Sequence, residues 1–138
     1  MGAVNPSKLR MREALLTYCA QQVQAPTHAI TVCFRQRSKN GTLLTRETCG
    51  SALRWLKIQS ERKIFKRQVK RPECRIGFVP FVEGSRELQN LHAHILLQAP
   101  PNIPYQHVCD VLQGLATRHA WIRAPLYIEP WRSRHWDR

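Results

Sequence analysis

Two short alternating segments joined by a polar loop constrain the fold more than any other feature of this sequence. In residues 75–83 and 91–98, apolar side chains recur at alternate positions, and the intervening residues 84–90 read GSRELQN. Successive side chains of a strand point to opposite faces, so the pattern predicts an antiparallel β-hairpin. Pro80 has no backbone N–H, which predicts that the first strand lies at a sheet edge or contains a bulge.

The remaining patterns complete a mixed α+β order. Thr45 has the character of a helix N-cap, and Pro104 suits a first helical turn. The predicted elements, in chain order, are a helix over 7–22, a strand over 28–36, a helix over 45–65, the two strands of the hairpin, a helix over 104–119 and a strand over 126–129. After the extra N-terminal helix, this βαββαβ order is typical of a ferredoxin-like or RRM-like domain with helices on one face of an antiparallel sheet. We therefore divide the chain into a helix and linker, 1–27, and one functional domain, 28–138.

The charge of the chain points to a polyanionic partner. Its 138 residues contain 22 Lys and Arg against 9 Asp and Glu, a net charge of +13. A small domain this basic usually binds nucleic acid.

Neither a membrane nor a disulfide framework is expected. No apolar run approaches the roughly 20 residues that span a bilayer, and the first residues lack a signal-peptide core, so we expect a cytoplasmic location without a membrane partner. The five cysteines include no CxxC pair, which predicts reduced thiols, most of them buried.

The second strand of the hairpin carries two histidines. In the segment LHAHILL, residues 91–97, His92 and His94 share one face of the predicted strand with Leu96. The opposite, core-facing side consists of Leu91, Ala93, Ile95 and Leu97. The histidines are therefore expected on the open face of the sheet, where both imidazoles can turn a ring nitrogen toward one divalent metal.

Glu83 is the predicted third ligand. It ends the first strand of the hairpin, so strand pairing can bring its carboxylate beside the histidines on the same face. The set Glu83, His92 and His94 leaves coordination positions open, as a catalytic metal requires in order to bind a substrate oxygen.

These residues resemble the HUH endonucleases, which are named for a His-hydrophobic-His motif matched here by His92-Ala93-His94. The greatest similarity is to the rolling-circle replication initiator (Rep) branch of plasmids, phages and small DNA viruses. The resemblance covers roughly residues 28–138, and its specific part is the glutamate, hairpin and HUH unit. It implies Mg²⁺ or Mn²⁺ held over a scissile phosphate of single-stranded DNA or an origin hairpin, in a bacterial host or mobile element, with a helicase or replication protein as a further partner.

The resemblance also implies a tyrosine nucleophile, which forms a 5′-phosphotyrosine link and leaves a free 3′-OH. Rep-type members carry it in a Tyr-x-x-Lys pattern after the fourth strand, and no tyrosine follows Tyr127 here. We expect it beyond residue 138, in a chain truncated before the tyrosine helix. Tyr18 and Tyr127 are the weaker candidates within the chain, with Tyr127 expected to pack mid-strand and Tyr105 to lie at the surface.

Basic residues supply the expected contacts to nucleic acid. The candidates are Arg35, Arg37, Lys63, Lys66, Arg67, Lys70, Arg71, Arg132 and Arg134. They contact phosphates in this interpretation, and Trp131 and Trp136 stack on unpaired bases or pack against a further helix.

Non-catalytic functions remain open from the sequence. A ferredoxin-like domain that only binds single-stranded nucleic acid has the same order of elements, as does a nuclease-dead regulator of replication. RNA recognition domains place stacking aromatic residues on the open sheet face, whereas this chain places His92 and His94 there, which favours the metal.

Overall fold

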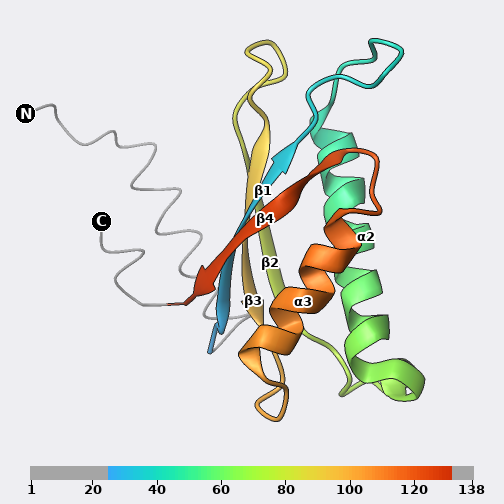
Figure 1. The fold of residues 1–138 in the computed structure, drawn as a ribbon, viewed down its shortest axis with the longest axis vertical. Coiled ribbons are helices and arrows are strands. Elements are labelled where there is room, and N and C mark those ends of the chain that lie inside the picture. Colours follow the sequence, from blue (N-terminus) through green and yellow to red (C-terminus); the bar gives the residue numbers. More distant parts are fainter. Residues whose placement is uncertain (1–24, 132–138) are drawn as a thin grey trace, which may run out of the picture.

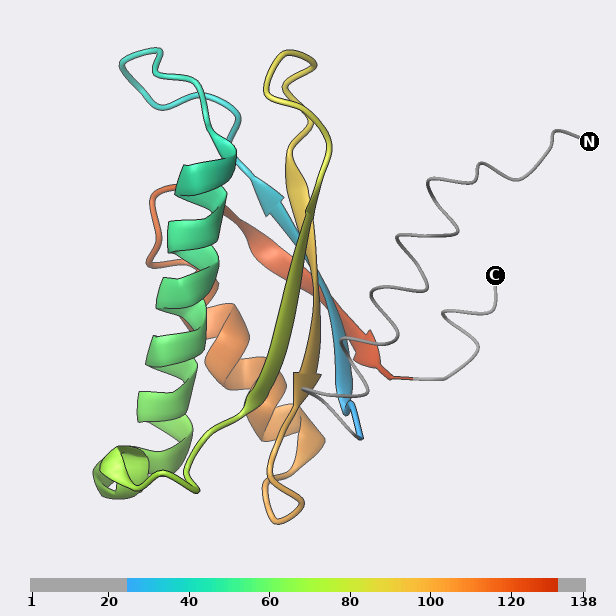
Figure 2. The same cartoon turned by 180° about the vertical axis from the view of Figure 1, so that it is seen from behind.

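The computed structural model describes residues 25–131, which form a four-stranded antiparallel sheet with both helices on one face (Figures 1 and 2). The elements are β1 (His28–Phe34), α2 (Arg46–Phe65), the 3₁₀ helix η1 (Lys66–Lys70), β2 (Gly77–Glu83), β3 (His92–Gln98), α3 (Tyr105–Ala116) and β4 (Ile122–Pro130). The predicted βαββαβ order is confirmed. The predicted helix over 7–22 lies outside the described residues.

The strand order is β2-β3-β1-β4, and every neighbouring pair is antiparallel, which is the ferredoxin-like arrangement. β2 is therefore an edge strand. Pro80 lies in the middle of β2, and its missing N–H is tolerated because β2 is at the sheet edge, which is one of the two positions that the sequence predicted.

The two faces of the sheet differ in character. Ile30, Val32 and Phe34 of β1 point toward the helices and are almost completely buried, as are Ala93 and Leu97 of β3. Each fully buried large apolar side chain of this kind contributes about 1.5–3 kcal/mol to stability. The residues between them on β1 and β3 face away from the helices, so the alternation correctly predicted which side of the sheet is open.

Helix α2 begins and ends where the sequence predicted. The Thr45 hydroxyl accepts a hydrogen bond from the Thr48 N–H at 3.1 Å, as an N-cap does. Its buried side comprises Cys49, Ala52, Leu53, Leu56, Ser60, Glu61 and Ile64. The start of α2 lies at the same end of the molecule as the β2–β3 loop, and its other end continues into η1 (Figure 1).

β4 is longer than the predicted strand over 126–129. Its first residues, which include Pro125, lack apolar alternation, and the register with β1 shifts between Thr31 and Cys33. Gln113 of α3 supports this irregular part, because its side-chain amide donates to the Leu126 carbonyl at 2.7 Å and accepts from the Leu126 N–H at 2.8 Å. The hydrogen bonds from Gln113 therefore stabilise a strand segment that the local sequence pattern does not predict.

The cysteine and membrane predictions can be assessed over the same residues. Cys33, Cys49, Cys74 and Cys109 are all free thiols, and three of them are buried. Neither helix within residues 25–131 combines the length and apolar content that crossing a bilayer requires.

Candidate metal centre

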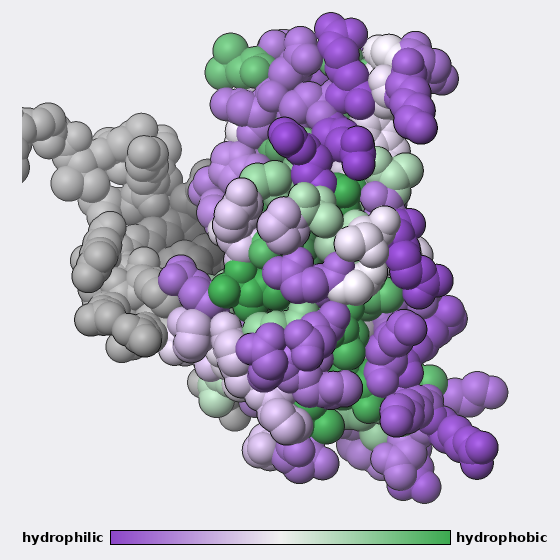
Figure 3. Space-filling view, viewed as in Figure 1, coloured by the Kyte–Doolittle hydropathy of each residue, from purple (hydrophilic) through white to green (hydrophobic). Residues whose placement is uncertain are grey.

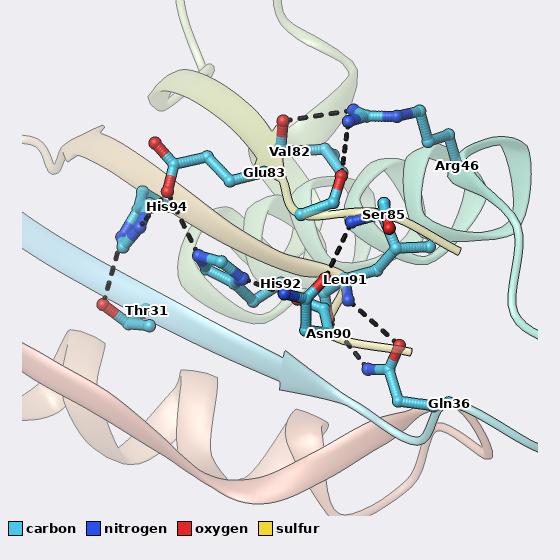
Figure 4. A network of polar contacts seen from close by, with 11 residues as sticks. Thr31, Gln36, Arg46, Val82, Glu83, Ser85, Asn90, Leu91, His92 and His94 are labelled. Carbon is cyan, nitrogen blue, oxygen red and sulfur yellow. Dashed lines mark hydrogen bonds and ion pairs between the residues drawn. The ribbon is translucent and has the colours of Figure 1, made fainter. Parts of the chain in front are cut away.

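Strand register assembles the predicted cluster on the open face of the sheet (Figure 4). Glu83 of β2 lies directly opposite His92 of β3, and His94 follows on the same face. One ligand atom from each residue lies within 4.8 Å of the other two. All three side chains are half-buried, which leaves the cluster open to a substrate.

The surroundings of His92 determine which of its ring nitrogens faces the cluster. Its Nδ1 lies 2.9 Å from the Asn90 carbonyl oxygen, which only accepts hydrogen bonds. Nδ1 therefore carries the proton, and the Nε2 of a neutral His92 presents a lone pair. That Nε2 lies 3.1 Å from Glu83 Oε2.

His94 is held by a hydroxyl of a different strand, which can donate or accept a hydrogen bond. Its Nδ1 lies 3.3 Å from the Thr31 hydroxyl of β1, and its Nε2 lies 3.3 Å from the same Glu83 Oε2. The two imidazole rings meet edge to face, with centroids 5.3 Å apart. Both rings thus have one nitrogen engaged by the scaffold and the other directed at one carboxylate oxygen.

This arrangement can hold a cation. When each neutral imidazole carries its proton on Nδ1, both Nε2 lone pairs face Glu83 Oε2, at 3.1 and 3.3 Å, which is repulsive unless a positive charge lies between them. A proton on a histidine relieves the repulsion for one pair, whereas a divalent ion relieves it for all three residues. Metal-binding histidines typically donate their other N–H to a carbonyl or similar acceptor, as His92 does here.

The β2–β3 loop positions the Asn90 carbonyl. Gly84 adopts a φ of 92°, and a Cβ at this position would lie 2.4 Å from the Asn90 oxygen. The Asn90 side chain accepts from the Ser85 N–H at 2.8 Å. Only glycine at 84 allows the loop to close with the carbonyl that orients His92 in place.

Two long polar side chains fix the strand ends that carry the cluster. Arg46, in the first turn of α2, donates to the carbonyls of Val82 and Gly84 at 3.2 and 2.7 Å, one on either side of Glu83. Gln36 hydrogen-bonds both the N–H and the carbonyl of Leu91, the residue before His92. Sequence reasoning missed both residues, since neither lies near the motif in the chain.

A hollow of about 370 Å³ adjoins the cluster on the open face. Its lining includes Glu83 and His94, so any occupant would lie against the cluster itself. The apolar part of the lining includes Val79, Phe81, Leu96 and Trp131. The cluster and the hollow therefore form one continuous site.

The two described tyrosines lie on opposite faces of the sheet, and both expectations about their packing were wrong. Tyr127 is 63% exposed, because β4 is an edge strand whose Tyr127 pairs with Thr31 on the open face. Tyr105 is half-buried on the helix side, where its ring stacks on His28 with centroids 4.3 Å apart. Burial and the neighbouring Cys109 raise the pKa of Tyr105 to about 12. Tyr18 lies outside the described residues.

The predicted nucleic-acid contacts fall into two groups in space. Arg35 and Arg37 follow β1 at the end of the sheet that carries the cluster, and Arg37 donates to Gln89 and to the Gly41 carbonyl. Lys63, Lys66, Arg67, Lys70 and Arg71 lie at the far end of α2 and on η1. The structure therefore does not bring the second group to the cluster. Arg132 and Arg134 lie outside the described residues.

Fold and site together define the class of this molecule. It is an α+β domain of ferredoxin-like topology with a His-His-Glu cluster that can hold a metal ion. Comparison with protein-family models, curated proteins and solved structures found no match to the chain.

Proposed function

We propose that this domain uses a divalent metal, Mg²⁺ or Mn²⁺, to nick and rejoin single-stranded DNA, as an initiator of rolling-circle replication does. The observation that carries the proposal is the convergence of His92 Nε2 and His94 Nε2 on Glu83 Oε2, with both Nδ1 atoms engaged elsewhere. A metal bound there would polarise a phosphoryl oxygen and neutralise charge that develops on it. The net charge of +13 suits a polyanionic substrate, with an origin hairpin and a helicase or other replication protein as proposed partners.

Tyr127 is the proposed nucleophile within the described residues, and a tyrosine beyond Arg138 is the alternative. Tyr127, Thr31 and His94 form one row across three neighbouring strands, so Tyr127 lies about 10 Å from His94 along the sheet. In the proposed step its phenolic oxygen forms a bond to phosphorus, the bond from phosphorus to the 3′ oxygen breaks, and that oxygen leaves with the phenolic proton. Tyr105, on the opposite face, cannot reach the same phosphate.

Metal binding is tested by thermal denaturation with added MnCl₂ or MgCl₂. At an ion concentration of 100 times Kd, the native chain gains about 2.7 kcal/mol of stability. The double variant His92→Ala/His94→Ala should gain nothing, and His107→Ala is the matched control on an exposed histidine of α3. Equal stabilisation of the native chain and the double variant contradicts the metal site.

Nicking is tested with labelled single-stranded DNA and Mn²⁺, by denaturing electrophoresis of the protein. The native chain should yield a covalent adduct, Tyr127→Phe should abolish it, and Tyr105→Phe should retain it. An adduct that persists in Tyr127→Phe assigns the nucleophile elsewhere. If neither this chain nor one extended beyond Arg138 forms an adduct or cleaves the DNA, the domain is not a nickase of this type.

A second candidate function is single-stranded nucleic-acid binding without catalysis. The hollow beside the cluster includes the rings of Phe81 and Trp131, and aromatic side chains on an open sheet face stack on unpaired bases. In this case DNA binding would survive His92→Ala/His94→Ala and would not respond to metal. Loss of affinity in Phe81→Ala without any cleavage by the native chain favours this function over nicking.

A further inference from the structure

A dense basic cluster lies at the end of α2, away from the metal centre. Between residues 62 and 75 the chain has seven cationic residues and one exposed acidic residue, Glu73. Six of the cations form what we call the α2–η1 cluster: Arg62, Lys63, Lys66, Arg67, Lys70 and Arg71. All six are exposed. Figure 3 shows hydrophilic side chains projecting at the lower right, where α2 and η1 end in Figure 1.

Within the part of the chain that the structure describes, the side chains of this cluster have no ion-pair or hydrogen-bond partner. Among residues 25–131 the ion pairs within 4.0 Å are those of Glu83 with His92 and His94, and none involves the cluster. None of the six side chains donates a hydrogen bond to another described residue. Arg46, Arg37 and Arg75, by contrast, donate to backbone carbonyls and serve the fold. The charge of the α2–η1 cluster is therefore not paired within residues 25–131, which favours an external polyanion.

The backbone beneath the cluster is well braced. Arg75 donates to the Val69 and Arg71 carbonyls at 2.6 and 3.2 Å, which ties η1 to the segment that follows it. The buried Glu61 accepts from the Ile76 N–H at 3.0 Å, which ties that segment back to α2. These contacts use the backbone carbonyl of Arg71 but none of the six cationic side chains, so the scaffold holds the cluster together without using its charges.

Lys66 stands at a position where glycine would be easier to accommodate. The chain reverses there between α2 and η1, with a φ of 53° that is uncommon for residues with a side chain. The turn joins the last turn of α2, which holds Arg62 and Lys63, directly to η1, which holds Arg67 and Lys70. A lysine at this position adds a cation to the cluster at a cost in backbone strain.

The composition of the cluster indicates which kind of polyanion it fits. Phe65 is the single aromatic residue between 62 and 75, and it packs against the core. The surface thus offers charges for phosphates but no exposed ring for stacking on unpaired bases. α2 has 20 residues and is about 30 Å long, so the cluster lies about that far from the helix start that braces Glu83.

We propose that the α2–η1 cluster is a second nucleic-acid surface, which binds the phosphate backbone of a duplex without reading its sequence. This surface is separate from the metal centre and does not depend on the proposed nicking. It would allow the domain to hold a duplex segment while the open sheet face is occupied by a single strand.

The experiment measures duplex binding as a function of salt. The probe is a DNA duplex of about 20 base pairs, roughly 70 Å long, with an RNA duplex of the same sequence as a second arm. The variant Lys66→Gln/Arg67→Gln/Lys70→Gln should reduce the slope of log K against log salt by about 3. The matched control Lys39→Gln/Arg86→Gln/Arg118→Gln removes the same charge from dispersed, exposed positions and should change the slope much less.

Two further variants separate this surface from the fold and from the metal centre. Lys66→Gly should bind the duplex more weakly while its thermal stability is unchanged or increased, a combination that a structural role of Lys66 would not produce. His92→Ala/His94→Ala should retain native duplex affinity. Equal losses in the two glutamine triple variants, or no binding of either duplex by the native chain, would overturn the proposal, whatever the outcome of the nicking assay.

Discussion

The two faces of the sheet each carry histidines, and their surroundings differ in a way that separates a structural imidazole from a candidate ligand. His28 of β1 is completely buried on the helix side, where Nδ1 lies 2.6 Å from the Thr27 hydroxyl and Nε2 lies 3.2 Å from the Tyr105 carbonyl. Both of its nitrogens are used by the fold. On the open face, His92 and His94 each have one nitrogen held by the fold and the other directed at Glu83. A buried histidine with both nitrogens bonded to groups of the fold is structural, whereas a half-exposed histidine with one nitrogen directed at a neighbouring carboxylate is a candidate ligand.

The largest effect that this comparison predicts is on stability. His28→Ala removes a fully buried ring, its stacking on Tyr105 and two hydrogen bonds, so the free energy of unfolding should fall by about 3 kcal/mol. His94→Ala, measured with a chelator present, should cost less than about 1 kcal/mol, because that side chain is 42% exposed. Urea denaturation of both variants checks this, and a larger loss in His94→Ala contradicts the assignment.

The second prediction concerns pH. Burial lowers the pKa of His28 in the fold, and that of His119 likewise. The unfolded chain therefore binds more protons than the folded chain below about pH 6.5, so stability falls as the pH decreases through this range. The slope reaches at most about 1.4 kcal/mol per pH unit for each histidine.

Urea denaturation in chelator between pH 7.5 and 5 measures this slope, with His28→Gln as the comparison. Glutamine keeps a donor and an acceptor but does not titrate, so the variant should lose stability less steeply as the pH falls. A variant whose slope equals that of the native chain would show that His28 does not contribute to the pH dependence.

The local sequence pattern predicted the three residues of the His-His-Glu cluster but not the residues that support them. Alternation within a hairpin is enough to place Glu83, His92 and His94 on one face, because strand pairing over a short loop leaves few choices of register. The partner of His94 is Thr31, more than sixty residues earlier in the chain, and it becomes visible only when β1 is known to lie beside β3. The available sequence signal for Thr31 was its polar side chain between the apolar residues Ile30 and Val32 of a predicted strand.

Other features needed the whole fold. The exposure of Tyr127 follows from the edge position of β4, and the stacking of Tyr105 on His28 follows from the approach of α3 to the start of β1. The residues around Pro125 pair with β1 although their sequence lacks a strand pattern, since Gln113 supplies hydrogen bonds from α3. The α2–η1 cluster is separated from the candidate metal centre because α2 runs away from that end of the sheet. The distribution of charged residues along the sequence does not predict this direction.

The third prediction uses two threonines of the first strand region to sharpen the comparison between the faces. Thr31→Val removes the hydroxyl that holds His94 Nδ1, so metal affinity should weaken by about tenfold with little change in stability without metal. Thr27→Val removes a partner of His28 and of the Ala99 N–H, so stability should fall while metal affinity is unchanged. Calorimetric Mn²⁺ titration measures metal affinity, and urea denaturation measures stability. If Thr31→Val and Thr27→Val change these two quantities in the same way, the two faces of the sheet do not differ as argued.

The smallest effect is expected at Arg46, which touches neither histidine. Its guanidinium holds the carbonyls on both sides of Glu83, so Arg46→Met should loosen the carboxylate and weaken metal binding by roughly threefold, below the range typical of direct partners of a ligand. The metal affinity of Arg46→Lys should lie between those of the native chain and Arg46→Met, since an ammonium lacks the planar guanidinium geometry that bonds two carbonyls at once. Arg54→Met, at an exposed position of the same helix, removes the same charge without such contacts and should leave metal affinity unchanged. If Arg46→Met and Arg54→Met weaken binding equally, the effect is one of net charge, and the positioning of Glu83 does not depend on α2.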